Sequence, residues 1–295
     1  MRILITGATG FVGSNLTHYF IDQGYSVTVT VRDSSSFYNL KDINDKIDTI
    51  LYDGTITSLK KGIKDKNIDT VLHLASLFIA EHKTDDIDNL ITSNILFGTQ
   101  LLEAMKVCGV KKIINTGTSW QYYHQETYNP VSLYAATKHA FSNILEYYIQ
   151  AEGFKAIDLI LYDTYGENDN RGKLINLLHQ FSDSKKVLDM SKGEQRLYFV
   201  HISDVCYAYK VALTLLDKTN TTHPIYSVRG NINYSLKEMV YLFEQVTGKN
   251  LKINWGKRAY RKREVMNPFS VGQIMPNWES KISLAEGLKL LHQSD

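Results

Sequence analysis

Short apolar runs and longer amphipathic stretches alternate along the amino-terminal half of the chain. The apolar runs predict strands, and the amphipathic stretches predict helices at 11–23, 86–109 and 131–152. The predicted strands are 2–6, 26–32, 48–52, 69–74, 111–116 and 155–162. Such alternation predicts an α/β fold with a doubly wound parallel sheet, which binds ligands beyond the carboxyl ends of its strands.

The pattern changes after residue 166. The polar stretch 167–194 predicts loops, 196–216 predicts a strand and a helix, 224–229 predicts a short strand, and 233–295 predicts two helices with tryptophan-bearing turns. Because no linker or repeat separates the two parts, we expect a smaller mixed α/β lid that lies over the sheet. The expected division is 1–166 with 195–232 for the sheet domain, and 167–194 with 233–295 for the lid.

Glycines mark the first junction between strand and helix. The chain opens MRILITGATGFVG, in which Gly7 permits a turn, Gly10 lets the backbone approach a pyrophosphate, and Gly13 lets the helix pack on the strand. Because this turn follows a strand and opens a helix, it predicts a dinucleotide site in a Rossmann-type fold rather than an ordinary flexible turn. The same site is expected to include Thr9, Phe11 and Val12.

The second predicted strand carries no carboxylate at its tip. In YSVTVTVRDSSS, residues 25–36, Val31 stands where an NAD site has the acid that binds the ribose 2′-hydroxyl, and Arg32 follows it. A guanidinium binds a 2′-phosphate, which a carboxylate would repel. The neighbouring Asp33 leaves NADH as the alternative, but Arg32 favours NADPH as the cofactor.

Charge and cysteine content narrow the possible partners. The 33 basic and 31 acidic residues give a net charge of +2, which indicates no nucleic-acid partner. Cys108 and Cys206 lie in apolar helical patterns without metal-ligand spacing, so we expect no metal site and a reducing compartment. No apolar run reaches the roughly 18 residues of a membrane span. With the first strand beginning at Met1, we expect a cytoplasmic protein without a membrane partner.

Tyr134 and Lys138 lie four residues apart in SLYAATKHA, so a helix places both side chains on one face. An ammonium beside a phenol favours the phenolate, and we expect the pKa of Tyr134 to fall from near 10 toward neutrality. Such a phenol suits proton transfer to or from a carbonyl oxygen, although the spacing alone also fits a surface pair. Thr118, in NTGTSW, offers a hydroxyl group that can orient the substrate oxygen.

Several motifs follow one another along nearly the whole chain. They are TGATGFVG at 6–13, VLHLAS at 71–76, YAATK at 134–138, YDTYG at 162–166, RLYFVHISDV at 196–205 and NWESKISLAEGL at 277–288. Together they resemble the extended short-chain dehydrogenase/reductase family of nucleotide-sugar epimerases, dehydratases and reductases. The resemblance implies a catalytic triad of Thr118, Tyr134 and Lys138, with Tyr134 as the acid/base. The further cofactor contacts that it implies are Asp53, Gly54, Leu74, Ala75, Ser76, Asn94, Thr116, Tyr134 and Lys138.

The same resemblance implies a nucleotide-diphosphate sugar as substrate, with Arg196 and Arg261 of the lid holding the diphosphate. Asp163 departs from the family pattern, which has asparagine there, and is expected to contact a sugar hydroxyl or to be held away by its neighbours. The other implied substrate contacts are Ser76, Glu81, Thr118, Ser119, Trp120 and Tyr134. The family also implies a homodimer through the helices near 86–109 and 131–152.

The candidate site residues argue against some reactions of this family but leave others open. Dehydratases carry an Asp-Glu pair directly after the threonine, where this chain has Ser119 and Trp120. Epimerase-reductases use a cysteine and a histidine, but Cys108 lies far in sequence from the expected cleft. A 4-epimerase, which returns its hydride to the substrate, needs only the triad and remains an alternative.

Two local stretches, INTGTSWQYY at 114–123 and REVMNPF at 263–269, are similar to the branch of CDP-abequose and CDP-paratose synthases. This similarity implies NADPH-dependent reduction of the C4 ketone of CDP-4-keto-3,6-dideoxyglucose, or of a similar nucleotide-linked deoxy sugar, in bacterial O-antigen biosynthesis. A non-enzymatic regulator that senses NADP on the same fold would lack the tyrosine and the lysine, and both are present here.

Overall fold

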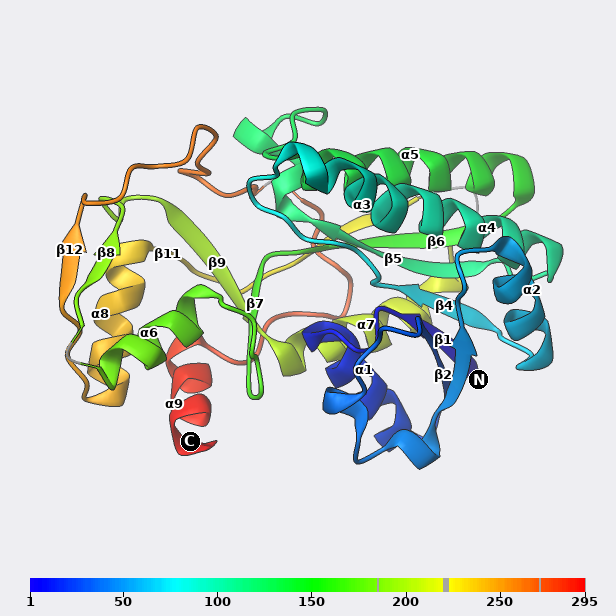
Figure 1. The fold of residues 1–295 in the computed structure, drawn as a ribbon, viewed down its shortest axis with the longest axis horizontal. Helices are drawn as coiled ribbons and strands as arrows, with labels where there is room; N and C mark the ends of the chain where they lie inside the picture. Colours follow the sequence, from blue (N-terminus) through cyan, green and yellow to red (C-terminus); the bar gives the residue numbers. More distant parts are fainter. Residues whose placement is uncertain (185, 220–222, 271, 295) are drawn as a thin grey trace.

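A computed structural model describes residues 1–184, 186–219, 223–270 and 272–294. Its centre is a seven-stranded sheet with the order β10-β6-β5-β4-β1-β2-β3 (Figure 1). The strands are β1 (Arg2–Thr6), β2 (Ser26–Val31), β3 (Asp48–Leu51), β4 (Thr70–His73), β5 (Lys112–Thr118), β6 (Lys155–Leu161) and β10 (Ile225–Val228). All neighbouring strands in it are parallel. The predicted Rossmann-type doubly wound sheet is therefore confirmed.

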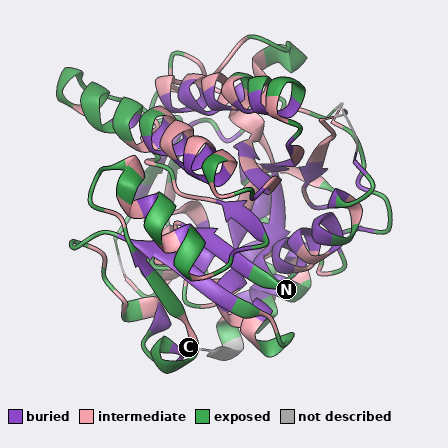
Figure 2. Ribbon diagram, turned by 90° about the vertical axis from the view of Figure 1, so that its right-hand side faces the viewer, coloured by how far each residue is buried: buried purple, intermediate pink, exposed green. Residues whose placement is uncertain are grey.

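Helices cover both faces of this sheet. One face carries α1 (Phe11–Asp22) and α7 (Ile202–Leu216), and the other carries α2 (Ile56–Asp65), α4 (Phe97–Val107) and α5 (Leu133–Glu152). Ile3 of β1 packs toward α1 and α7, whereas the next residue, Leu4, packs toward α2, α4 and α5. This period of two buries both faces of the strand, and Figure 2 shows the sheet as the most deeply buried part of the fold.

The lid forms a second group of elements beside the sheet domain (Figure 1). A three-stranded sheet has the order β11-β9-β7, and β12 pairs with β8. These strands are β7 (Asp163–Tyr165), β8 (Leu188–Met190), β9 (Arg196–His201), β11 (Asn233–Ser235) and β12 (Ile253–Trp255). The helices are α6 (Leu174–Ser182), α8 (Leu236–Thr247) and α9 (Leu284–Ser294), and they share one hydrophobic core with these strands.

The structure corrects the expectation of loops over 167–194. This stretch contains α6 and β8, because Ile175 and Leu178 lie on one face of a short amphipathic helix and are buried in the lid core. The helix α2 was also not predicted, and its two buried residues, Leu59 and Ile63, are four apart. Short elements with only two buried anchors leave a weak periodic signal.

The predicted continuous helix 86–109 is interrupted. A 3₁₀ turn (Thr84–Asp86) leads into α3 (Ile87–Ile91), a π-helical segment (Thr92–Leu96) and α4. The wider π turn carries the buried Asn94. Other 3₁₀ turns lie at Tyr38–Leu40, Asn44–Lys46, Ser119–Gln121 and Tyr123–Gln125.

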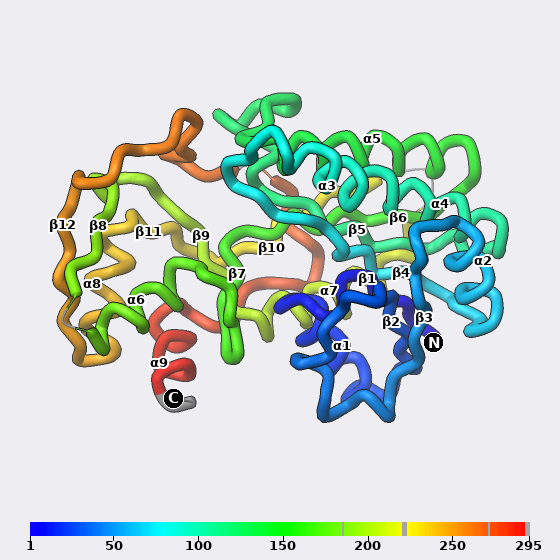
Figure 3. The backbone as a smooth tube through the Cα atoms, in the orientation of Figure 1, coloured from blue at the N-terminus to red at the C-terminus, as the bar shows by residue number. Residues whose placement is uncertain are grey.

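The tube in Figure 3 shows how the chain passes between the two parts of the fold. It leaves the large sheet after β6, returns through α7 and β10, and enters the lid again at β11. β9 pairs with β7 and β11, so it belongs to the three-stranded sheet, whereas β10 belongs to the large sheet. The exact domain boundaries remain a prediction.

None of the helices in the described part of the chain is long and apolar enough to cross a membrane.

Candidate active site

The glycine turn lies at the carboxyl end of β1. Gly7 has a φ of 70°, and a Cβ atom there would lie 2.8 Å from the backbone nitrogen of Ala75. A Cβ atom on Gly13 would collide with the carbonyl oxygen of Gly7. Gly10 precedes α1 without a side-chain cap, and the first turn of this helix carries no acidic residue. The amino end of α1 is therefore open to an anion, and the turn fits the pyrophosphate of a dinucleotide.

The loop after β4 is fixed against this turn. The Thr6 hydroxyl group accepts hydrogen bonds from the backbone N–H groups of Leu74 and Ala75, both at 3.1 Å, and lies 2.9 Å from His73 Nδ1. Asn94 holds the next residues, because its side chain bonds both backbone groups of Leu77 at 2.6 and 3.0 Å. These contacts place Ser76 beside the glycine turn.

Tyr134, Lys138 and Thr118 come together with Ser76 at this edge of the sheet. Ser132 caps the amino end of α5, and the buried Tyr134 lies in the first turn of that helix. The hydroxyl groups of Ser76 and of Thr118, the last residue of β5, lie close enough to the Tyr134 phenol to lower its pKa. Lys138 is only 3% exposed. The predicted catalytic side chains are therefore held on regular elements next to the glycine turn.

The predicted direction of the Tyr134 pKa is wrong. Burial raises the pKa of Tyr134 to about 12, and only the hydrogen bonds of Ser76 and Thr118 act to lower it. Lys138 does not counteract this burial, and its own pKa falls to about 8 because its ammonium is desolvated. Tyr134 is consequently a neutral phenol at pH 7, which is the form that donates a proton.

Arg32 lies at the exposed end of β2, as its sequence position predicts. Its backbone N–H donates to the Ser35 hydroxyl at 2.9 Å, and its carbonyl accepts from the Ser35 N–H at 2.9 Å. No ion pair or hydrogen bond occupies its guanidinium within the described residues. The side chain is therefore free to meet a ligand beyond the strand.

The remaining predicted cofactor residues surround the same edge. Gly54 has a φ of 96°, and the Asp53 carboxylate accepts from the backbone and hydroxyl of Thr55 at 2.9 and 2.7 Å. These hydrogen bonds lower the pKa of Asp53, so the group is ionised.

Two other predicted cofactor residues are bonded within the protein. The Thr116 hydroxyl group is bonded to the Tyr209 hydroxyl at 2.5 Å, and Asn94 also donates to the Thr137 hydroxyl at 2.9 Å. Thr116 and Asn94 thus make internal contacts that fix the site.

A cavity of about 340 Å³ lies between the sheet edge and the lid. Phe78 lines it and packs edge-on against the Tyr134 ring at 5.0 Å. Asp163 and Trp120 lie on the same wall, and the guanidinium of Arg261 lies 5.7 Å from the Trp120 ring centroid. The cavity also receives the basic side chains of Lys173, Arg258 and Arg263. With Arg261 these four cations outnumber the three acidic residues of the lining, Asp163, Asp189 and Glu264, and they suit a diphosphate.

Asp163 is the residue that departs from the family pattern, which has asparagine at this position. Burial raises the pKa of Asp163, whereas the charges of Lys173, Arg171 and Arg261 act to lower it. Among the described residues this carboxyl group makes no side-chain hydrogen bond and no ion pair within 4.0 Å. It lines the cavity, and its contact with a sugar hydroxyl stays a prediction.

Of the predicted substrate residues, Trp120, Asp163 and Arg261 line this cavity, whereas Ser76, Glu81, Thr118, Ser119, Tyr134 and Arg196 do not. The guanidinium of Arg196 bonds the side chain and carbonyl of Asn233 and lies 3.2 Å from Glu238. Glu81 lines a neighbouring cavity of about 600 Å³, which shares Trp120 with the first. Ser119 instead opens the 3₁₀ turn after Thr118. Because β9 alternates its faces, Arg196 is turned away, while Gln195 and Leu197 line the cavity.

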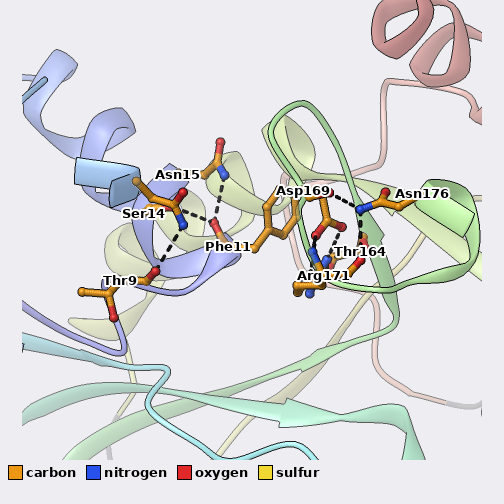
Figure 4. Close-up of polar contacts among 9 residues, drawn as sticks. Thr9, Phe11, Ser14, Asn15, Thr164, Asp169, Arg171 and Asn176 are labelled. Carbon is orange, nitrogen blue, oxygen red and sulfur yellow. Dashed lines mark hydrogen bonds and ion pairs between the residues drawn. The ribbon is translucent and has the colours of Figure 1, made fainter. Parts of the chain in front are cut away.

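Sequence reasoning missed Arg171, which connects the lid loop to the glycine turn (Figure 4). Its guanidinium lies 4.3 Å from the Phe11 ring centroid, bonds both carboxylate oxygens of Asp169 at 2.7 Å, and donates to the Thr164 carbonyl at 2.9 Å. The cluster RGK at 171–173 was the available signal, because Lys173 lines the cavity and Arg171 lies over Phe11. Nothing in its local pattern indicates the stacking on Phe11.

No cluster of three or more His, Cys, Asp or Glu side chains that could hold a metal ion occurs in the described ranges.

Comparison with known proteins identifies the family of such a site. The model of the NAD dependent epimerase/dehydratase family matches residues 3–228. The CDP-abequose synthase of Yersinia pseudotuberculosis is 29% identical over 271 residues, which cover 91% of this chain and 92% of that protein. The CDP-abequose synthase of Salmonella muenchen is 28% identical over 292 residues, covering 98% and 96%.

Solved structures support the same fold. A UDP-glucose 4-epimerase from Thermotoga maritima, solved with UDP-glucose, has a TM-score of 0.84 at 23% identity and covers 99% of this chain and 98% of that chain. A UDP-glucose 4-epimerase from Brucella ovis, in complex with NAD, has a TM-score of 0.85 at 17% identity with the same coverage. At these identities the likeness concerns the fold alone.

Proposed function

The chain belongs to the NAD-dependent epimerase/dehydratase family, and on this premise we propose that it reduces the C4 ketone of a nucleotide-linked deoxy sugar with NADPH. The observation that carries the proposal is the buried phenol of Tyr134, which lies close to Thr118 and Ser76 beside an open glycine turn. A site with a protonated donor at its reacting end is prepared for ketone reduction.

The residues divide the work of this reduction. NADPH, when bound, supplies the hydride that reduces the carbonyl carbon. The Tyr134 hydroxyl donates a proton to the ketone oxygen, and Thr118 and Ser76 hydrogen-bond around that oxygen. The Lys138 ammonium, one helical turn away, stabilises the tyrosinate that remains and binds the ribose of the cofactor.

Binding of the substrate in the lid cavity supplies the energy that orients the ketone. Arg261 and Lys173 carry positive charge for a diphosphate, and Trp120 offers an aromatic face to the sugar or base. Binding energy gained at the diphosphate, remote from the reacting carbon, is converted into alignment of the ketone. Asp163 accepts a hydrogen bond from a sugar hydroxyl in this arrangement.

The choice of NADPH rests on Arg32. Its unpaired guanidinium at the tip of β2 suits a 2′-phosphate, and Val31 removes the acid that an NAD site uses. Solved relatives of this fold are described in complex with NAD, so the cofactor preference is a feature of this chain's own residues. A net reduction of this kind draws on the NADPH pool of the cytoplasm.

The choice of substrate follows the curated relatives. Three of them are named CDP-abequose synthase, at 26–29% identity and almost full length. We therefore propose CDP-4-keto-3,6-dideoxyglucose, or a similar nucleotide-linked deoxy sugar of O-antigen biosynthesis, as substrate. A nucleotide-sugar 4-epimerase is the second candidate, because relatives named UDP-glucose 4-epimerase also match most of the chain.

A substrate panel tests this proposal. The purified protein is incubated with NADPH and with CDP- and dTDP-linked 4-keto sugars, and the product is analysed by NMR. We expect consumption of one NADPH per sugar, fastest with the CDP-linked 3,6-dideoxy compound. Interconversion of two fully hydroxylated nucleotide sugars without NADPH consumption would favour the epimerase.

A further inference from the structure

A row of polar side chains runs along α5 away from Tyr134. Lys138, Ser142 and Glu146 follow it at intervals of four residues, so all four side chains lie along one side of the helix. Lys138 is 3% exposed, and Glu146 is 44% exposed at its side chain. The row therefore leads from the reacting phenol to the protein surface.

A buried carboxylate on β6 lies beside the middle of this row. Asp158 is 1% exposed and accepts hydrogen bonds from the Ser142 hydroxyl at 2.7 Å and from Asn115 Nδ2 of the neighbouring strand at 2.9 Å. His223 Nε2 lies 3.0 Å from the same carboxylate, and His223 Nδ1 lies 3.0 Å from Glu146. These partners lower the pKa of Asp158 despite its burial, so the carboxylate is ionised.

Lys138 lies one helical turn before Ser142, whose hydroxyl group donates to Asp158 at 2.7 Å. It forms no ion pair within 4.0 Å in the described ranges, and Asp158 is the one group whose charge opposes the desolvation of its ammonium. His73 of β4 also faces Lys138, but burial lowers the pKa of this imidazole to about 3, so it carries no charge. The other titratable groups that face Asp158 are His223, His139, Tyr122 and Tyr209.

We propose that Asp158 is a positioning residue whose buried negative charge keeps Lys138 an ammonium beside Tyr134. His223 and Glu146 form the outer part of this arrangement, because they tie the carboxylate to the surface end of α5. The inference rests on the proposed function, in which the Lys138 ammonium stabilises the Tyr134 tyrosinate. The charge relation between the two buried residues is independent of the substrate.

The titration of Lys138 measures this relation directly. The ¹³Cε resonance of Lys138, assigned by its loss in Lys138→Arg, is followed against pH in the protein without substrate. We expect a midpoint near 8 in the wild type. Asp158→Asn removes a buried negative charge and favours the neutral amine, so the midpoint falls by about half a pH unit or more. Asp48→Asn, the same change at an exposed carboxylate of β3 paired with Lys66, leaves the midpoint in place.

A purely structural role for Asp158 predicts a different result. Asp158→Asn would then lower the thermal midpoint of unfolding without moving the Lys138 titration, and that outcome overturns the proposal. If Asp158→Asn does not fold, His223→Gln is the second variant. His223 offsets part of the Asp158 charge, and both carboxylates raise its pKa against the effect of burial. Its removal should raise the Lys138 midpoint, and an unchanged or lower midpoint contradicts the proposal.

The pH dependence of kcat/KM tests the proposed function and the role of Asp158 separately. In Asp158→Asn, the alkaline limb of kcat/KM for NADPH-dependent reduction is expected to move to lower pH together with the Lys138 midpoint. If no ketosugar is reduced by the wild type, the proposed function fails, but the NMR titration still decides the role of Asp158. If reduction occurs and neither the limb nor the midpoint moves, the role of Asp158 fails alone.

Discussion

Tyr134 occupies a position where burial and two hydroxyl groups act on its pKa in opposite directions. Burial prevails and holds the phenol neutral, which is the form required to protonate a ketone. The four-residue spacing placed Tyr134 and Lys138 on one helix, where both are buried, but spacing carries no information about desolvation. The pKa of a side chain depends on residues that come from distant parts of the chain, here Ser76 and Thr118.

Tyr134→Phe removes the proposed proton donor and keeps the ring that packs against Phe78. We expect kcat to fall by about 10²-fold or more, with little change in NADPH affinity. Steady-state kinetics and NADPH fluorescence titration measure the two effects separately. Tyr147→Phe, at an exposed position of the same helix, is the matched control. A Tyr134→Phe enzyme with a near wild-type rate would remove Tyr134 from this role.

Arg32→Ala tests the choice of cofactor. Because a hydrogen bond to a charged group contributes about 1.5–3 kcal/mol, NADPH affinity should fall by about tenfold or more, while NADH affinity changes little. Binding of both cofactors is measured by fluorescence titration. Arg2→Ala, at the opposite end of the neighbouring strand β1, should leave the preference intact. An unchanged ratio of NADPH to NADH affinity in Arg32→Ala contradicts the assignment.

At the scale of elements, hydrophobic periodicity predicted the strands of the large sheet and the long helices that cover it. Each of these elements buries a repeated apolar face. The three-residue strands of the lid gave no such signal, since their places are set by pairing with distant segments such as β9. The π-helical segment was also invisible in the sequence. It depends on Asn94 reaching the backbone of Leu77, seventeen residues earlier.

Asn94→Ala tests whether this segment fixes the loop that carries Ser76. The substitution leaves both backbone groups of Leu77 without their partner and removes one donor to the Thr137 hydroxyl, which is expected to cost about 2 kcal/mol of the free energy of unfolding. Urea unfolding measures the change. Asn143→Ala, at an exposed position of α5, should stay within about 0.5 kcal/mol of the wild type. Equal stabilities of the two variants would show that the Asn94 contacts are dispensable.

At the scale of the whole molecule, the candidate site lies where the sheet domain meets the lid. The sheet supplies the glycine turn, Tyr134 and Thr118, whereas the lid supplies Arg261 and Lys173. Sequence motifs located the sheet residues because their positions follow regular elements. The lid residues were placed less well, and Arg196 in particular pairs with Asn233 and Glu238.

The expected homodimer is also a property of the whole molecule. Ile87, Ile91 and Leu96 are 40–46% exposed along the helical stretch that the family resemblance assigns to an interface. We expect a dimer in analytical ultracentrifugation and a shift toward monomer in Ile91→Glu. Ile274→Glu, at a position 80% exposed outside these helices, should leave the distribution unchanged. A wild-type protein that sediments as a monomer at all concentrations would exclude this interface.

The fate of the hydride tests the central claim most directly. The protein is incubated with CDP-4-keto-3,6-dideoxyglucose and NADPH carrying deuterium on the transferable position of the nicotinamide C4, and the sugar is examined by NMR. We expect deuterium at C4 of the sugar, a new hydroxyl group there, and one NADP⁺ formed for each product molecule. A deuterium-free sugar with the NADPH unspent would contradict it.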